Sequence, residues 1–104
     1  MKKDKQKTEV IFRKFKGEIL ALFPHIIWDY SGDVTCYAHL GQHGSADYKY
    51  VIANSKPINK PESLGLYSEL ESIGYNLTPV KRQHYNKYWE NKYEFEGLII
   101  NKVL

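Results

Sequence analysis

Two runs of strand-forming residues, 34–40 and 46–53, flank a five-residue segment that contains two glycines. This pattern predicts an antiparallel β-hairpin. Small side chains meet large ones along one face when the register is Leu40–Ala46, Ala38–Tyr48, Cys36–Tyr50 and Val34–Ile52. A slip of one residue would mix apolar and polar side chains on both faces, so the pattern supports this register.

Other segments carry apolar residues at helical spacing. We expect helices over 8–23, 59–73 and 85–97. A capping box of Asn59 and Glu62 marks the start of the second helix. Further strands are expected at 25–30 and 76–82, and a last strand or a docking tail at 98–104.

These elements follow the order α-β-β-β-α-β-α. The 104 residues are therefore expected to form a single α+β domain, 1–104, in which residues 1–7 are a flexible basic N-terminus. Its antiparallel sheet should have three to four strands, with two to three helices packed on one face. One cluster should form the core: Phe15, Ile19, Trp28, Tyr50, Leu70 and Ile73.

The order of the first five elements is similar to that of double-stranded-RNA-binding domains. Ser55, Lys56 and Lys60 stand where those domains place lysine near the start of their second helix. Pro57 and Pro61 depart from the pattern of these domains, and a further strand and helix follow. The similarity is limited to the element order and these lysines, and we assign the chain to no family.

A single cysteine, Cys36, excludes a disulfide within the chain. No apolar run approaches the ~18 residues of a transmembrane helix. The basic start is not followed by the apolar segment of a secretion signal, so we expect a cytoplasmic protein that does not act at a membrane. No phosphate-binding loop or other known catalytic motif occurs, and no cofactor is expected.

The spacing Cys36-x-x-His39-x-x-x-His43, followed by Asp47, contains residue types that bind zinc. In the expected hairpin, however, Cys36 faces the core and His39 faces the opposite side, because strand side chains alternate. One ion could not bind both residues without a bulge. No metal site is therefore expected.

The polar face of the expected hairpin brings His39 opposite Asp47. A carboxylate can orient a histidine and favour its charged form, which would suit acid–base cleavage of RNA. A metal-independent RNase-like enzyme that uses His39 and Asp47 is therefore the alternative interpretation. The same two residues could also be an ordinary cross-strand ion pair.

Basic residues gather in the first 18 residues and again from residue 81, where aromatic residues lie between them. This combination suits contacts with phosphates and bases, or with a protein surface. The expected binding residues are Lys81, Arg82, His84, Tyr85, Lys87 and Trp89. We expect a small non-enzymatic binding or regulatory protein whose partner is a nucleic acid or a protein, with homodimerisation through its tyrosines as a related arrangement.

Overall fold

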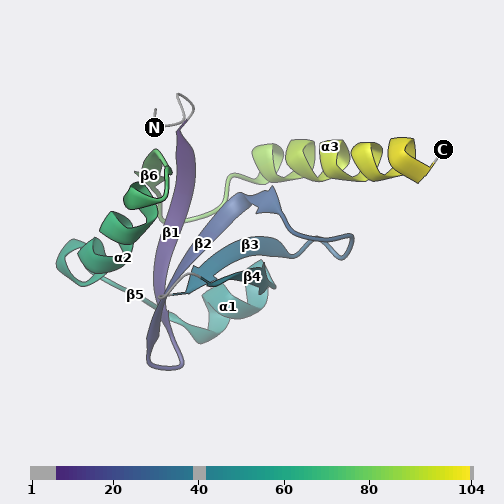
Figure 1. Ribbon diagram of the computed structural model, residues 1–104. Coiled ribbons are helices and arrows are strands. Elements are labelled where there is room, and N and C mark those ends of the chain that lie inside the picture. The colour runs from purple at the N-terminus through teal and green to yellow at the C-terminus, as the bar shows by residue number, and fades with distance from the viewer. Residues whose placement is uncertain (1–6, 39–41, 104) are drawn as a thin grey trace.

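The computed structural model describes residues 7–38 and 42–103. Within these ranges it has three helices and one six-stranded sheet (Figure 1). The elements are β1 (Thr8–Phe15), β2 (Glu18–Ile27), β3 (Val34–Ala38), β4 (Gln42–Ala46), α1 (Tyr48–Asn54), β5 (Lys56–Pro57), α2 (Lys60–Ser72), β6 (Leu77–Pro79) and α3 (Tyr85–Val103). None of these helices has the length and apolarity needed to cross a membrane.

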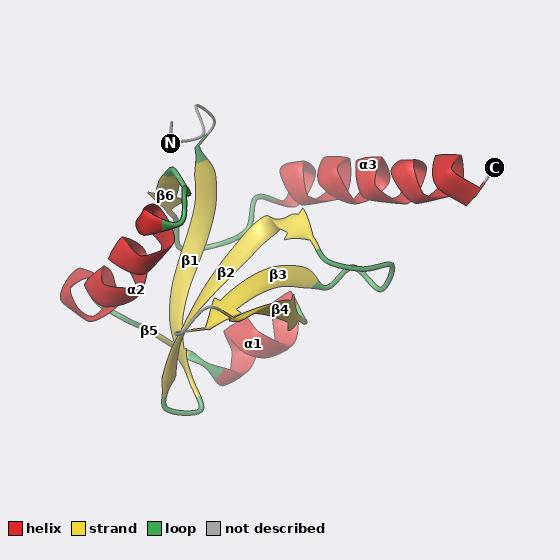
Figure 2. Cartoon of the chain, viewed as in Figure 1, coloured by secondary structure: helices red, strands yellow, loops and turns green. Residues whose placement is uncertain are grey.

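The α+β class expected from the sequence is confirmed, but the element order differs. The order is β-β-β-β-α-β-α-β-α, so six strands replace the expected three to four. It also differs from the order of double-stranded-RNA-binding domains, because in the described residues the first element is a strand, not a helix. Figure 2 shows β1 to β4 as successive antiparallel strands.

β1 has two partner strands along one edge. The strand order is β4-β3-β2-β1-β5, and β6 pairs with β1 off this path. β6 runs parallel to β1 along Thr8–Val10, and β5 runs antiparallel to it beside Arg13 and Lys14. A strand within the expected range 76–82 is thus confirmed as β6, but it has only three residues at the sheet edge, and residues 80–82 lie outside it.

Helices cover both faces of the sheet, so the expected packing on one face is wrong. Phe23 of β2 shares a buried cluster with Leu66 and Leu70 of α2. Leu22, the preceding residue, belongs to the cluster on the opposite face, with Val51 of α1 and side chains of α3. This alternation follows from the strand geometry, which sends successive side chains to opposite faces.

The single core cluster expected from the sequence is also wrong. Phe15 and Ile19 pack against different clusters, on opposite faces of the sheet. Only Leu70 of the six expected members is buried. Three of the others are exposed: Trp28, Tyr50 and Ile73.

Residues 8–23, expected to be a helix, form most of the β1–β2 hairpin. Phe15 pairs with Glu18, and the two turn residues Lys16 and Gly17 have φ angles of +51° and +82°. Two positive φ angles are typical of the tight turns that match the twist of a hairpin. The helix prediction failed because these strands bury side chains on both faces and therefore lack clear polar–apolar alternation.

Gly17→Ala should lower the free energy of unfolding by about 1–2 kcal/mol, because an L-residue at positive φ clashes with its own backbone. No atom lies within 4 Å of the added Cβ at Gly17 or at Gly65 of α2. Gly65→Ala is therefore a matched control, and it should raise the free energy of unfolding by about 1 kcal/mol. Urea unfolding measures both. A stabilising Gly17→Ala would contradict the hairpin and agree with a helix.

β3 and β4 form the second hairpin, but in a register different from the expected one. Ala46 pairs with Val34, so the second strand ends before the expected partner of Cys36. Asp47 begins a helix instead, because its carboxylate accepts a hydrogen bond from the Tyr50 amide at 3.2 Å. Tyr50 therefore lies on α1, and its expected cross-strand pairing with Cys36 is wrong.

The expected cap at the start of the second helix is present. The third helix, in contrast, ends later in the chain than expected. The Asn59 side chain accepts a hydrogen bond from the Glu62 amide at 2.9 Å, which is one of the two hydrogen bonds of the expected capping box. α3 continues through Gly97 to Val103. Residues 98–103 are therefore helical, and the expected last strand or docking tail is wrong.

Candidate binding groove and the Glu9 cluster

The edge of β1 has a gap between its two partner strands. β6 pairs with β1 as far as Val10, and β5 pairs with it from Arg13. The Val10 carbonyl accepts a hydrogen bond from the Val80 amide at 2.8 Å, so it points toward this edge. Because peptide groups alternate in direction along a strand, those of Phe12 face the same edge. Such an edge can pair with another extended chain.

A groove of about 840 Å³ lies at this gap, bordered by β5, β6 and α2. We call it the β1-edge groove. Figure 1 shows β5 and β6 near opposite ends of α2, beside β1. Most of the lining is apolar: Ile11, Phe12, Pro57, Ile58, Leu64, Tyr67, Pro79 and Val80. Its volume falls within the range of about 300–1,000 Å³ found for ligand sites.

Three basic residues line the β1-edge groove, Arg13, Lys60 and Lys81, and none of the described residues that line it is acidic. Arg13 is held in place because its guanidinium donates to Ser55 Oγ at 2.8 Å and to the carbonyls of Ile52 and Ser55. Lys60 and Lys81 are exposed. The groove therefore combines an apolar interior with a positive border, which favours a ligand that is apolar and anionic.

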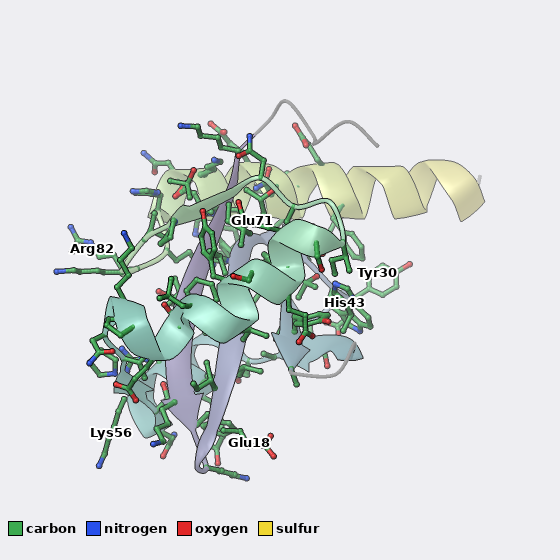
Figure 3. All side chains as sticks on the ribbon, turned by 60° about the vertical axis from the view of Figure 1, so that its left-hand side comes forward. Glu18, Tyr30, His43, Lys56, Glu71 and Arg82 are labelled. Atoms are coloured by element: carbon green, nitrogen blue, oxygen red, sulfur yellow. The ribbon has the colours of Figure 1, made fainter. Side chains whose placement is uncertain are left out.

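Two of the residues predicted to bind a partner belong to this region. Lys81 lines the groove, and Arg82 follows it in the chain. Both are exposed. Figure 3 shows Arg82 and Lys56 projecting from the same side of the molecule. Basic side chains therefore extend beyond the groove along this side.

The other predicted binding residues lie elsewhere. His84 and Lys87 contact the carboxylate of Glu9 on β1, at 2.8 Å and 3.3 Å. Tyr85 begins α3, and its side chain lies outside the described part of the structure. Trp89 is half-buried and borders a separate hollow on α3, together with Asn86, Glu90 and Tyr93. The six residues therefore do not form one surface.

A bulge in β2 shapes the surroundings of Glu9. The pairing of β2 with β3 shifts within residues 23–27. Pro24 and His25 consequently direct their carbonyls to side chains near α3. The Pro24 carbonyl accepts a hydrogen bond from Gln83 Nε2, and the His25 carbonyl accepts one from Asn91 Nδ2, each at 2.7 Å. The bulge thus positions His25 and also anchors the start of α3.

Glu9 lies at the centre of a polar cluster built from three parts of the chain. Its Oε1 atom lies 2.8 Å from Nδ1 of His84, which precedes α3, and 3.5 Å from Nε2 of His25 on the bulge. Its Oε2 atom lies 3.3 Å from Nζ of Lys87. We call Glu9, His25 and His84 the Glu9 cluster.

Burial and charge set the protonation of this cluster. Burial alone would raise the pKa of Glu9, but the hydrogen bond from Lys87 and the neighbouring positive charges lower it below its usual value. Burial is the main cause that lowers the pKa of His25, and it outweighs the opposing attraction of Glu9. His25 is therefore a neutral imidazole at pH 7, beside an ionised carboxylate.

The residues of the two other arrangements considered in the sequence lie apart from one another or fall outside the described residues. Cys36 and His43 lie on opposite faces of the sheet, and His43 Nε2 lies 2.9 Å from the hydroxyl of Tyr75. His39 lies outside the described residues. Asp47 caps α1 and is not on a strand, so the expected cross-strand placement of the RNase-like pair is wrong.

Sequence reasoning missed Glu9, Arg13, His25 and Lys60 as site residues. Glu9 and Arg13 fell in the expected first helix, and His25 was expected to lie in a regular strand. Nothing in the sequence singles out Arg13, because it stands beside Lys14 in a segment that also holds Glu9 and Lys16. No family model, curated protein or solved structure matches this sequence, so the function is inferred from the geometry alone.

Proposed function

We propose that this chain is a small non-enzymatic binding protein whose β1-edge groove holds an extended, acidic segment of a partner protein. The observation that carries the proposal is a gap in a strand edge that coincides with an apolar groove bordered by Arg13, Lys60 and Lys81. An added strand would bond to the peptide groups of Phe12. Its alternate side chains would enter the groove, while its carboxylates would meet the cations.

The groove favours a protein segment over a nucleic acid, the two partners between which the sequence did not decide. Apolar side chains make up most of its lining. Apolar side chains of a partner protein would cover them and remove them from water. Binding of nucleic acid is typically supported by a continuous basic surface with accessible aromatic rings. Here Trp89 borders a hollow that shares no residue with the groove, and Glu9 already pairs with His84 and Lys87.

The proposal retains the cytoplasmic location and the possible self-association expected from the sequence. Several tyrosines are well exposed, namely Tyr30, Tyr50 and Tyr93, although none of them lines the groove. The alternative to a partner protein is a second copy of the chain in the groove. Light scattering during gel filtration tests it, because occupation of the groove by a second copy would double the mass and block peptide binding.

The double variant Lys81→Ala/Arg82→Ala should bind an acidic peptide at least about tenfold more weakly, a loss of about 1.4 kcal/mol. The probe is a labelled ten-residue peptide in which aspartate or glutamate alternates with valine or leucine. Fluorescence anisotropy at constant salt measures its affinity. The matched control is Lys16→Ala/Lys49→Ala, which removes the same charge from two exposed lysines that do not line the groove and should change the affinity little.

Two outcomes would contradict the proposal. The first is equal binding of a peptide with lysine in place of the acidic residues, since this would show that the positive border does not select the ligand. The second is tighter binding of a single-stranded oligonucleotide than of the acidic peptide, which would favour the nucleic-acid partner. Cleavage of RNA by the native chain but not by His39→Ala would instead support the RNase-like alternative.

A further inference from the structure

We propose that the Glu9 cluster binds a divalent metal ion of the zinc type, with Glu9, His25 and His84 as its three protein ligands. The proposal is independent of the β1-edge groove. It assigns a role to a buried histidine and a carboxylate that the proposed binding function does not use.

The spacing of the donor atoms suits such an ion. Each of the three residues offers one ligand atom, and these atoms all lie within 4.8 Å of one another. Glu9 Oε1 is 2.8 Å from His84 Nδ1 and 3.5 Å from His25 Nε2. A tetrahedral zinc ion, with bonds of about 2.0–2.2 Å, holds neighbouring ligand atoms about 3.3–3.5 Å apart. Small side-chain adjustments would therefore bring all three ligands onto one ion.

The hydrogen bonding of His25 gives an independent reason to expect a ligand. Its side chain is only 7% exposed. Within the described part of the chain, neither of its ring nitrogens makes a hydrogen bond of normal geometry, and the nearest polar atom to Nε2 that the geometry gives is Glu9 Oε1 at 3.5 Å. Buried polar atoms without such bonds are rare in folded proteins because each costs free energy. A metal ion bound to Nε2 would satisfy that nitrogen.

The chemistry of the ligands agrees with zinc. Two imidazoles with one carboxylate favour zinc and similar transition metals over magnesium or calcium, which prefer oxygen ligands. Lys87 contacts the other carboxylate oxygen, Oε2, and leaves Oε1 directed at the two histidines.

The position of the cluster indicates what the ion would do. Glu9 lies on β1, His25 on the β2 bulge, and His84 on the segment that leads into α3. An ion held by all three would tie these parts together and fix His84, whose side chain is 60% exposed. Because His84 is open to solvent, the fourth coordination position would be reached by water or by a ligand atom from outside the chain.

Titration calorimetry with zinc chloride on the metal-free full chain tests the proposal at pH 7.4. We expect one zinc ion per chain and a higher midpoint of thermal unfolding in the presence of zinc. His84→Ala should weaken zinc binding at least tenfold. The fold should survive this change, because His84 is exposed, and circular dichroism checks it. Glu9→Gln should also weaken zinc binding at least tenfold, since the neutral amide is a poorer ligand. Magnesium chloride should give no binding at the same concentrations.

The matched control is His43→Ala, because His43 is also an exposed histidine but pairs with Tyr75, away from the Glu9 cluster. It should bind zinc like the native chain. The proposal is overturned if the native chain binds no zinc at a one-to-one ratio. It is also overturned if His84→Ala retains full affinity, or if His43→Ala loses it, because the zinc would then occupy a different site. None of these results depends on peptide binding at the groove.

Discussion

Leu70→Ala is expected to lower the free energy of unfolding by about 2–5 kcal/mol. Leu70 is fully buried and lies in the cluster that joins α2 to the sheet, where it packs with Val10 and Phe23. The substitution removes apolar area from the core and leaves a cavity that neighbouring side chains fill only in part. Urea unfolding followed by circular dichroism measures the change, which is a large share of the ~5–15 kcal/mol typical of a domain.

Leu64→Ala is the matched control for Leu70→Ala. Both residues lie on α2, but Leu64 is 49% exposed. The same deletion at Leu64 should therefore cost less than about 1 kcal/mol, because the removed atoms were already partly in water. Equal losses at the two positions would mean that α2 does not pack on the sheet in the orientation described here.

Local signals were sufficient to predict α2. Its start depends on contacts between residues close in sequence, namely the capping of the Glu62 amide by Asn59. Its end is marked by Gly74, which has a φ angle of +112°, as is common for a glycine that follows a helix. Such signals do not depend on the rest of the fold, and for this reason the bounds of α2 agree with the sequence.

The β1–β2 hairpin could not be predicted in this way because its sequence carries two conflicting patterns. Ile11, Phe15, Ile19 and Leu22 follow helical spacing, yet β2 is buried on both faces. Apolar residues then occur at almost every position, and a stripe at helical spacing appears within them. Gly17 is the residue that favours the hairpin over a helix. It adopts the positive φ angle of the turn, and glycine is unfavourable inside a helix.

The candidate sites depend on strand pairing. The sequence therefore predicted only those site residues that lie together in one short segment. Lys81 and Arg82 were identified because basic and aromatic residues lie close together from residue 81 onward, a signal contained in one short segment. Arg13 joins Lys81 at the groove only because β6 pairs in parallel with β1 and β5 pairs beside it. Glu9 and His25 meet because a bulge displaces His25 from the β2–β3 ladder. Long-range pairing and bulges leave no local signal in one sequence.

Asn91→Ala should lower the free energy of unfolding by about 1–3 kcal/mol, because it leaves the carbonyl of His25 without its partner on α3. Asn91 lies on α3, 66 residues after His25 in the chain, and its Nδ2 atom donates to that carbonyl at 2.7 Å. The β2 bulge removes this carbonyl from the β2–β3 ladder, so no neighbouring strand can replace the lost hydrogen bond. Urea unfolding measures the change, and hydrogen exchange in α3 should become faster.

Asn86→Ala on the same helix provides the matched control for Asn91→Ala. Asn86 is exposed, whereas Asn91 is half-buried. The two substitutions remove the same side chain and change helix propensity in the same direction, since alanine is the better helix former. Asn86→Ala should therefore leave stability unchanged or raise it slightly, and the difference between the variants isolates the hydrogen bond to the bulge. Equal stability of the two variants would mean that α3 is not anchored at His25, and the Glu9 cluster would then lose its support from that helix.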